Sequence, residues 1–428
     1  MNFIERDKQN IWHPFTQMKT AFPPVHIERA KGAMLYAVDG TKYIDAVSSW
    51  WVNIHGHSNE YIANRIAEQA KKLEHVIFAG FTHTPAIELA ERLIELLPEH
   101  FSKVFFSDNG STSVEVAVKM ALQYWHNKNC FQKTKIIAFE NAYHGDTFGA
   151  MSVGGKSAFN KPFQEYLFDV THIALPNENN IEQLKTQLEA LVKEDNVVAF
   201  IFEPLIQGAG GMLMYTPEHL DELLKIANAH SVICIADEVM TGFGRTGRTF
   251  AINYLKQQPD IICLSKGITG GFMPLGVTIC SERIFEAFYS DEKEKTFFHG
   301  HSYTANPLAC EAANASLFLL SEEKCRTEIN SIVSAHVNFL QMLKNLKKVT
   351  NVRMQGTILA FEIITPEGSS YFNSIQKEAY AYFMKRGVLL RPLGNTIYIM
   401  PPYCITPEEL NKVYEVILDF ISQLTFTP

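Results

Sequence analysis

The sequence predicts an α/β fold with a large domain built on a mostly parallel sheet and a smaller α+β domain. Three observations lead to this prediction. The chain has 428 residues, of which 46% are hydrophobic, enough for one large domain with a smaller companion. Short apolar runs alternate with helical stretches between about residues 60 and 310. The pattern changes from about residue 325 onward.

The apolar runs of the first region are predicted to be strands buried on both faces. Each has three to six consecutive apolar residues bounded by polar residues or glycine, a pattern typical of central strands in a parallel sheet. Helical stretches separate them, as crossover connections between parallel strands require. The predicted strands are 104–106, 136–139, 197–202, 232–236 and 261–264.

The remaining segments predict the rest of the architecture. An amphipathic helix is expected over 326–347, and a hairpin is expected between 388–391 and 397–400, with its turn at 393–395. The first 50 or so residues lack the alternation of strand and helix and are expected to pack with the smaller domain or at a subunit interface. We predict an N-terminal segment over 1–58, a large cofactor-binding domain over 59–324 and a small C-terminal domain over 325–428.

Bulk properties disfavour several classes of function. The net charge of −8 would repel nucleic acid, and no apolar run approaches the ~18 residues of a membrane span. The N-terminus is too charged for a secretion signal, and seven scattered cysteines without C-x-x-C spacing fit a reducing cytoplasm. The His-Gly-His triplets 55–57 and 299–301 lack acidic or cysteine partners at ligand spacing, so we expect no metal.

The segment 107–115 is predicted to bind a phosphate group. It follows a strand and opens a helix, and Gly110 allows the backbone to approach an anion closely. The free amide groups and the dipole at a helix start favour negative charge. Thr112 and Glu115 also match a capping box, so capping alone is an alternative reading of these two residues.

Lys266 and Asp237 each follow one of two successive strand runs. Ligands of open α/β sheets lie at the carboxyl ends of such strands, where an uncompensated charge is costly. Pyridoxal phosphate relieves both costs, because its aldehyde forms a Schiff base with a lysine and its protonated ring nitrogen pairs with an acid. The alternative is a buried Lys–Asp ion pair. Gly242–Gly247 fits the dinucleotide fingerprint, but it lies too far past its strand and is predicted to be a loop.

Several motifs together resemble the class III pyridoxal phosphate aminotransferases, in order and spacing through most of the chain. They are Glu203–Pro204, Gln207–Gly211, Asp237–Val239, Gly242–Gly247, Ser265–Gly267 and Asn306–Ala309. Within that class, four further segments resemble the members that act in biotin synthesis: Trp12–Thr16, Ser48–Trp51, Tyr143–Met151 and Arg391–Gly394.

The resemblance implies roles for individual residues. Lys266 would hold the cofactor and move the substrate proton, Asp237 would keep the ring nitrogen protonated, and Tyr143 would cover one ring face. Cofactor-binding residues would be Gly110, Ser111, Tyr143, Asp237, Val239, Lys266, His301 and Ser302, with Ser302 contributed by the partner subunit of a homodimer. Substrate-binding residues would be Phe15, Trp50, Gly300, Arg391 and Tyr398, with Arg391 gripping a carboxylate.

The same resemblance implies the reaction: transfer of an amino group from S-adenosylmethionine to 8-amino-7-oxononanoate. Three positions depart from the common pattern, since Met240, Ser302 and Phe15 stand where Gln, Thr and Tyr are usual. Phe15 leaves the donor open between S-adenosylmethionine and lysine, although an aromatic wall of Phe15, Trp50 and Trp51 favours a sulfonium cation. Other functions considered are another class III ω-amine transaminase, an aminomutase on the same fold, and a cofactor-binding regulator.

Overall fold

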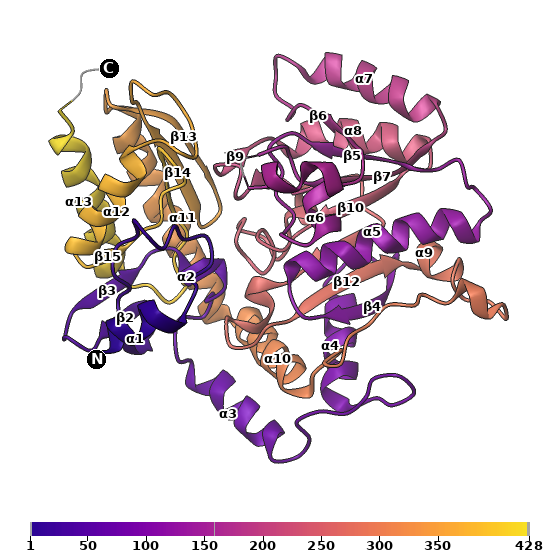
Figure 1. Ribbon diagram of the computed structural model, residues 1–428, viewed down its shortest axis with the longest axis horizontal. Coiled ribbons are helices and arrows are strands. Elements are labelled where there is room, and N and C mark those ends of the chain that lie inside the picture. The colour runs from indigo at the N-terminus through magenta and orange to yellow at the C-terminus, as the bar shows by residue number, and fades with distance from the viewer. Residues whose placement is uncertain (1, 158, 426–428) are drawn as a thin grey trace.

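A seven-stranded sheet forms the centre of the larger part of the molecule (Figure 1). The computed structural model describes residues 2–157 and 159–425. All neighbouring strands run parallel except β12, which is antiparallel to both β11 and β4. In spatial order the strands are β4 (Phe101–Ser107), β12 (Gly276–Ser281), β11 (Ile261–Leu264), β10 (Ile233–Asp237), β7 (Val197–Phe202), β5 (Lys135–Phe139) and β6 (Val170–Ile173). The predicted fold class is confirmed.

The central strands are buried on both faces, as their apolar runs predicted. Side chains of β7 alternate between two hydrophobic clusters: Phe200 and Phe202 belong to one, and Ile201 to the other. β10 shows the same alternation, with Cys234 on one face and Ile235 on the opposite face. Each strand therefore needs a helical layer on either side.

Helices supply these two layers (Figure 1). α5 packs against β7, β10, β11 and β12 on one face, and α8 packs against β10 and α7. α10 lies against α3 and α4 at the other end of the sheet. The helices of this part are α3 (Glu60–Ala70), α4 (Thr84–Glu95), α5 (Gly110–Asn127), α6 (Phe148–Val153), α7 (Ile181–Lys193), α8 (Pro217–Ala229), α9 (Glu282–Glu286) and α10 (Pro307–Ser321).

The two ends of the chain meet in a second part of the molecule, at the left of Figure 1. A four-stranded sheet in the order β1 (Ile27–Lys31), β2 (Met34–Ala37), β3 (Lys42–Asp45) and β15 (Val388–Leu389) joins them, and β3 pairs in parallel with β15. Its helices are α1 (Phe3–Asn10), α2 (Ser48–Trp51), α11 (Glu323–Lys344), α12 (Ile375–Lys385) and α13 (Pro407–Gln423). The predicted domain boundaries stay a prediction of the sequence.

The hairpin predicted around 393–395 is wrong. β15 belongs to the four-stranded sheet, whereas β16 (Thr396–Ile399) pairs with β14 (Ile358–Ile363), which in turn pairs with β13 (Val349–Gln355). Only a single bridge links Leu393 to Thr396. Both runs are apolar and separated by a glycine turn, a pattern that does not reveal that each strand has a better partner elsewhere in the sequence. A short ribbon of β8 (Ile206–Gln207) and β9 (Leu213–Met214) completes the strands.

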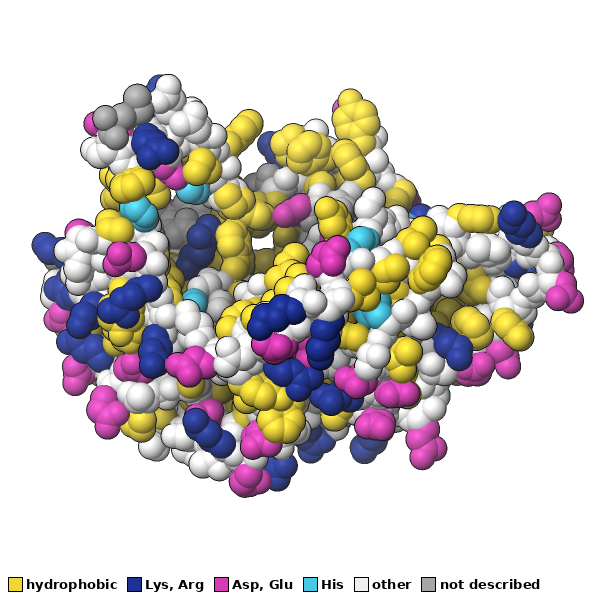
Figure 2. All heavy atoms as spheres, turned by 90° about the horizontal axis from the view of Figure 1, so that it is seen from below, with side chains coloured by type: hydrophobic (Ala, Val, Ile, Leu, Met, Phe, Trp, Pro, Cys, Tyr) yellow, Lys and Arg dark blue, Asp and Glu magenta, His cyan; other side chains and the backbone are white. Residues whose placement is uncertain are grey.

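The surface is mixed in charge and hollowed between the two parts (Figure 2). Lys, Arg, Asp and Glu side chains are interspersed over the face shown, without a large area of one sign. None of the described helices has both the length and the apolar composition needed to cross a membrane. Within residues 2–157 and 159–425, His, Cys, Asp and Glu form no group of three or more that could hold a metal ion.

Candidate active site

One edge of the large sheet brings together residues from five strand ends. Asp237 is the last residue of β10, in register with Cys263 of β11, and Lys266 comes two residues after β11. The loops after β4, β5 and β7 reach the same edge, because these strands run in the same direction. A cavity of about 710 Å³ opens there, lined among others by Gly110, Ser111, Tyr143, Glu203, Asp237, Val239 and Lys266. Six of these seven residues were predicted.

The amine of Lys266, which lines this cavity, is a weaker base than an ordinary lysine. Burial lowers the pKa of its amine to about 8; the charges of Asp237 and Glu203 oppose that change, and the guanidinium of Arg245 adds to it. The amine Nζ lies 4.4 Å from the ring centroid of Trp51. Lys266 also has a positive φ of 46°, an unfavourable backbone conformation for a residue other than glycine. A strained, buried lysine with a lowered pKa is typical of a functional site.

Asp237 is held by a histidine that the sequence reasoning did not assign to the site. His144 Nδ1 lies 2.7 Å from Asp237 Oδ2, and both side chains are buried. The other oxygen, Oδ1, accepts a hydrogen bond from the Val239 N–H at 3.0 Å. Burial alone would lower the pKa of His144, but the hydrogen bond and charge of Asp237, together with Glu203, raise it. The two oxygens of Asp237 are therefore held by two different groups, the His144 ring and the Val239 N–H.

The start of α5 has the features of a phosphate site. The helix begins at Gly110, where an added Cβ would lie 2.6 Å from Cγ1 of Val239, so only glycine fits without movement. Ser111 Oγ accepts a hydrogen bond from the Thr147 N–H at 3.0 Å, which joins the helix start to the loop after β5. Backbone N–H groups at the first turn of an 18-residue helix favour an anion.

The predicted capping box was wrong in its residues. Asn109 is the N-cap, and its side chain accepts from the Thr112 N–H at 3.0 Å while Thr112 Oγ1 accepts from the Asn109 N–H at 3.1 Å. Glu115 instead accepts hydrogen bonds from the N–H groups of Gly149 and Ala150 at 2.6 and 3.1 Å. The helix starts three residues earlier than the predicted box assumed, so Glu115 lies beyond the cap and its carboxylate binds the start of α6.

The residues at this edge fit pyridoxal phosphate. An amine, a carboxylate, a glycine held against Val239 and the N-terminus of α5 line one cavity. These are the groups that the cofactor's aldehyde, ring nitrogen and phosphate require. A plain ion pair between Lys266 and Asp237 is absent from the salt bridges of the described residues, since Asp237 pairs with His144.

Four of the five predicted substrate residues, Phe15, Trp50, Arg391 and Tyr398, lie in or next to this cavity. Trp50 lines both this cavity and a second one of about 500 Å³, which Phe15 and Arg391 also line. The Arg391 guanidinium lies 4.5 Å from the Trp50 ring centroid, and the rings of Phe15 and Trp50 are 5.6 Å apart edge to face. Tyr398 is buried, and its hydroxyl accepts a hydrogen bond from Trp51 Nε1 at 3.0 Å.

The segment 300–302 is not brought to this cavity within the described part of one chain, because Gly300, His301 and Ser302 are not among its lining residues. They lie instead in a loop before α10. Close by, the rings of His75 and Tyr303 are 5.4 Å apart, and Tyr303 is 66% exposed. The predicted contribution of Ser302 to a partner subunit stays a prediction.

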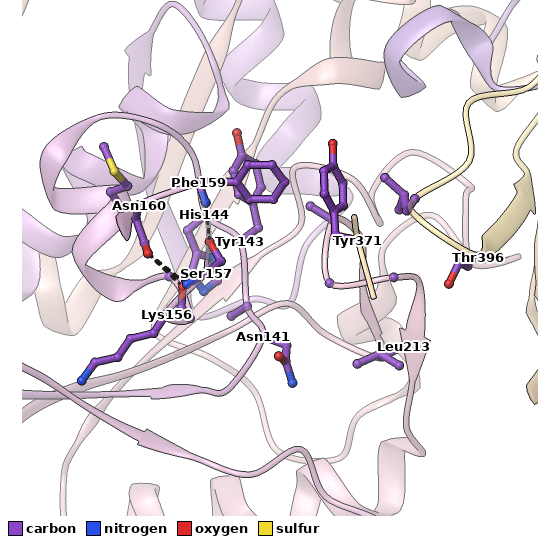
Figure 3. Close-up of a pocket in the computed structure, with 18 of the residues that line it drawn as sticks. Asn141, Tyr143, His144, Lys156, Ser157, Phe159, Asn160, Leu213, Tyr371 and Thr396 are labelled. Carbon is purple, nitrogen blue, oxygen red and sulfur yellow. Dashed lines mark hydrogen bonds between the residues drawn. The ribbon is translucent and has the colours of Figure 1, made fainter. Parts of the chain in front are cut away.

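A third cavity of about 320 Å³ lies on the other side of the loop after β5 (Figure 3). Tyr143, His144, Gly145 and Asp146 line both this cavity and the larger one, so this stretch is a wall between them. In Figure 3, Tyr371 of the smaller part faces the cavity from the side opposite His144, and the side chain of Lys156 points away.

Glu203 and His144 are the residues of the site that sequence reasoning missed. Glu203 directly follows the fully buried strand β7, the same signal that identified Asp237, yet it was used only as part of a motif. His144 carried no such signal, since it lies in an irregular loop five residues past β5.

Comparison with known proteins agrees with this geometry. Residues 16–421 match the family model described as aminotransferase class-III. The adenosylmethionine-8-amino-7-oxononanoate aminotransferase of Synechococcus elongatus is 48% identical over 423 residues, which cover 97% of this chain and 99% of that protein. The Staphylococcus aureus protein of the same name is 38% identical, covering 96% of this chain and 95% of that protein.

Solved structures show the same architecture. The adenosylmethionine-8-amino-7-oxononanoate aminotransferase of Methanocaldococcus jannaschii superposes with a TM-score of 0.93 at 36% identity, covering 99% of both chains. An omega transaminase from Pseudomonas jessenii, in complex with PMP, gives a TM-score of 0.92 at 27% identity with the same coverage. With its lysine and acid at the sheet edge and its match over nearly the whole length, the chain belongs to the class III aminotransferases, a family of pyridoxal phosphate-dependent transaminases.

Proposed function

We propose that this transaminase moves an amino group from S-adenosylmethionine to 8-amino-7-oxononanoate and so forms 7,8-diaminononanoate in biotin synthesis. The observation that carries the proposal is the Arg391 guanidinium, stacked 4.5 Å from the Trp50 ring that the cofactor cavity and the second cavity share. A planar cation there suits a carboxylate at the far end of a chain whose other end reaches Lys266. The names of relatives up to 48% identical support the same reaction.

Lys266 and Asp237 perform the chemistry in this proposal. Pyridoxal phosphate, when bound, supplies an electron sink for the carbanion that remains when a proton leaves the amine-bearing carbon of the substrate. The Nζ of Lys266 removes that proton and returns it to the other carbon, a role that its pKa of about 8 suits near neutral pH. Asp237 places its carboxylate beside the ring nitrogen, and the hydrogen bond with His144 holds it there.

The remaining predicted residues bind and orient. Gly110 and Ser111 bind the phosphate group at the α5 N-terminus, and Tyr143 and Val239 bound the cofactor ring. Trp51 takes part as well, because its indole lies below Lys266 Nζ and is held by Tyr398. In this proposal Tyr398 shapes the substrate cavity indirectly, by fixing the position of the Trp51 indole that lines it.

The donor is proposed from the aromatic wall. Phe15 and Trp50 present apolar faces to the second cavity, and their rings contact each other edge to face. A sulfonium cation and a purine bind to such faces by cation–π contact and stacking, whereas the short side chain of lysine covers less of them. Lysine is the second candidate, since Phe15 offers no hydroxyl to a donor's polar groups.

We also propose a homodimer in which Ser302 and its neighbours Gly300 and His301 serve the partner's cofactor site. Large apolar side chains stand exposed near this segment: Ile77 at 60%, Phe81 at 63%, Phe298 at 69% and Tyr303 at 66%. Exposed apolar groups of this size support an interface.

We also propose a cytoplasmic location, because all seven cysteines are free thiols, as is usual in a reducing compartment.

The test is a single-turnover panel. Cofactor-loaded protein is mixed separately with S-adenosylmethionine, lysine and a simple ω-diamine, and conversion to the pyridoxamine form is followed by absorbance. The pyridoxamine form is then mixed with 8-amino-7-oxononanoate, and 7,8-diaminononanoate is measured by mass spectrometry. Rapid conversion by the diamine without diaminononanoate formation would replace this proposal with a general ω-amine transaminase.

A further inference from the structure

Glu203 is a buried carboxylate of the cofactor cavity to which the proposed chemistry gives no role. It follows the last residue of β7, is 5% exposed and lines the cavity together with Asp237 and Lys266. Within the described residues no Lys, Arg or His comes within salt-bridge distance of it. A buried carboxylate without an ion-pair partner is costly unless backbone donors and nearby charges compensate it.

Two backbone donors provide that compensation. Glu203 Oε1 accepts from the Tyr143 N–H at 3.0 Å, and Oε2 accepts from the Gly208 N–H at 2.8 Å. The first donor belongs to the wall between the two cavities, and the second to the turn that follows Glu203. One side chain thus spans two segments that are about 60 residues apart in sequence.

These two segments pack too closely to move independently. Gln207 Nε2 donates to the Glu140 carbonyl at 2.8 Å, and a Cβ at Gly210 would lie 2.5 Å from the Asn141 carbonyl oxygen. On its other side the turn contacts the cavity, because a Cβ at Gly208 would lie 2.5 Å from Met240 Sδ. A shift of the turn would therefore displace both the Tyr143 loop and the floor of the cavity.

The charge of Glu203 acts on the same groups. Burial, with the charge of Asp237, raises the pKa of Glu203 to about 7, whereas His144 and the two backbone donors lower it. In return Glu203 raises the pKa of both His144 and Lys266. Both Asp237 and Glu203 therefore interact electrostatically with the His144 imidazole and the Lys266 amine.

We propose that Glu203 is a positioning residue of the cofactor site: its two oxygens hold the Tyr143 loop and the Gly208 turn together, and its charge balances His144 and Lys266. The inference rests on the proposed placement of the cofactor at Lys266. It assigns the residue a positional and an electrostatic role, and these two roles respond differently to substitution.

Three variants separate the roles. Glu203→Gln removes the charge and leaves one oxygen, so only one of the two N–H groups keeps its acceptor while the new NH₂ faces the other donor. Glu203→Asp keeps the charge on a side chain too short to reach both donors. Glu238→Gln is the matched control, because Glu238 is fully buried, has a pKa likewise raised by burial to about 7, and bonds Thr241 and Ile252 outside the cavity lining.

The readouts are the pH transition of the visible absorbance of the holoenzyme and the rate of cofactor loss. In Glu203→Gln the midpoint of the absorbance transition should move to lower pH, because the anion that favours the protonated nitrogen of Lys266 is gone. Cofactor should also dissociate roughly tenfold faster, because one of the two backbone N–H groups loses its acceptor. Glu203→Asp should keep the wild-type transition but lose cofactor at the faster rate. Glu238→Gln should match the wild type in both.

An unchanged transition in Glu203→Gln, or the same shift in Glu238→Gln, would overturn the inference. If circular dichroism shows that Glu203→Gln does not fold, Glu203→Asp decides alone, and normal cofactor retention in it would overturn the positional role. Absence of any pH-dependent band in the wild type would instead refute the placement of the cofactor at Lys266, which separates the two failures. No substrate is needed, so the identity of the donor does not enter.

Discussion

His144 Nδ1 lies 2.7 Å from Oδ2 of Asp237, and both groups are shielded from water. The ring nitrogen of the cofactor would face an acid whose other neighbour is already a cation or a hydrogen-bond donor. The acid is therefore held in place by the protein itself, in a site shielded from solvent. Substitutions at this pair should be visible in catalysis and in stability at the same time.

Asp237→Asn should retain cofactor but lose transaminase activity. The amide keeps the shape of the carboxylate and removes its charge, so carbanion stabilisation should fall by several kcal/mol, on the order of a 10²–10³-fold loss in kcat. Steady-state kinetics and cofactor absorbance measure both effects. Asp260→Asn, at an ion pair with Arg283 away from the cavity lining, is the control. Turnover close to wild type in Asp237→Asn would mean that another group holds the ring nitrogen.

The same variant should show a pH-dependent loss of stability. The pKa of His144 is raised in the folded protein. The stability that protonated His144 gives to the fold is therefore fully present below the ordinary histidine pKa of about 6.5, and it is lost as the pH rises through the raised pKa. Without the carboxylate this contribution disappears. The difference in Tm between wild type and Asp237→Asn should therefore be larger at about pH 6 than at about pH 9. A difference independent of pH would argue against a protonated His144.

Covalent capture of pyridoxal phosphate by the cofactor-free protein should accelerate with pH through about 8, where the Lys266 amine loses its proton. Stopped-flow absorbance at several pH values measures the rate. Borohydride reduction followed by peptide mapping should then place the adduct on Lys266. Lys156, which lines the neighbouring cavity, is the internal control. An adduct on Lys156, or a midpoint near the ordinary lysine pKa of ~10.4, would contradict the assignment.

Arg391→Ala should lower kcat/KM for 8-amino-7-oxononanoate by about 10- to 100-fold, as expected for loss of a charge-assisted bidentate contact. The donor half-reaction should be affected much less if the donor is anchored elsewhere. Single-turnover rates of the donor half-reaction and of the 8-amino-7-oxononanoate half-reaction measure the difference. Arg386→Ala provides a control, because Arg386 also stacks on an aromatic ring, that of Tyr382, but pairs with Asp419 outside the cavities of the site. Equal damage to both halves would show that the two substrates share Arg391.

Phe15→Tyr tests the choice of donor. Adding a hydroxyl to the wall of the second cavity gives a donor's amine or carboxylate a new partner while the apolar face remains. If S-adenosylmethionine is the natural donor, its half-reaction should already be fast in the wild type and change less than tenfold in the variant. Rapid conversion of wild type by lysine with none by S-adenosylmethionine would reverse the donor assignment.

Much of the site was predictable because its residues follow buried strands. Asp237 and Lys266 stand directly after short apolar runs, and parallel strands bring such positions to one edge. Residues in irregular loops gave no periodic signal, so His144 was missed although it is bonded to Asp237. The hairpin at 393–395 failed for a related reason, since apolar runs specify strands but do not specify their partners.

The pairing of β3 with β15 has a consequence for how the protein is made. Ser48, just after β3, donates to the carbonyl of Met400, 352 positions further along the chain. At roughly 5–20 residues per second a ribosome needs on the order of 20–70 s to cover that distance. During this interval β1, β2 and β3 can pair with one another, but the edge of β3 that pairs with β15 stays open to wrong partners. The mouth of the substrate cavity, including Trp50, therefore cannot form before the segment around Met400 has been synthesised.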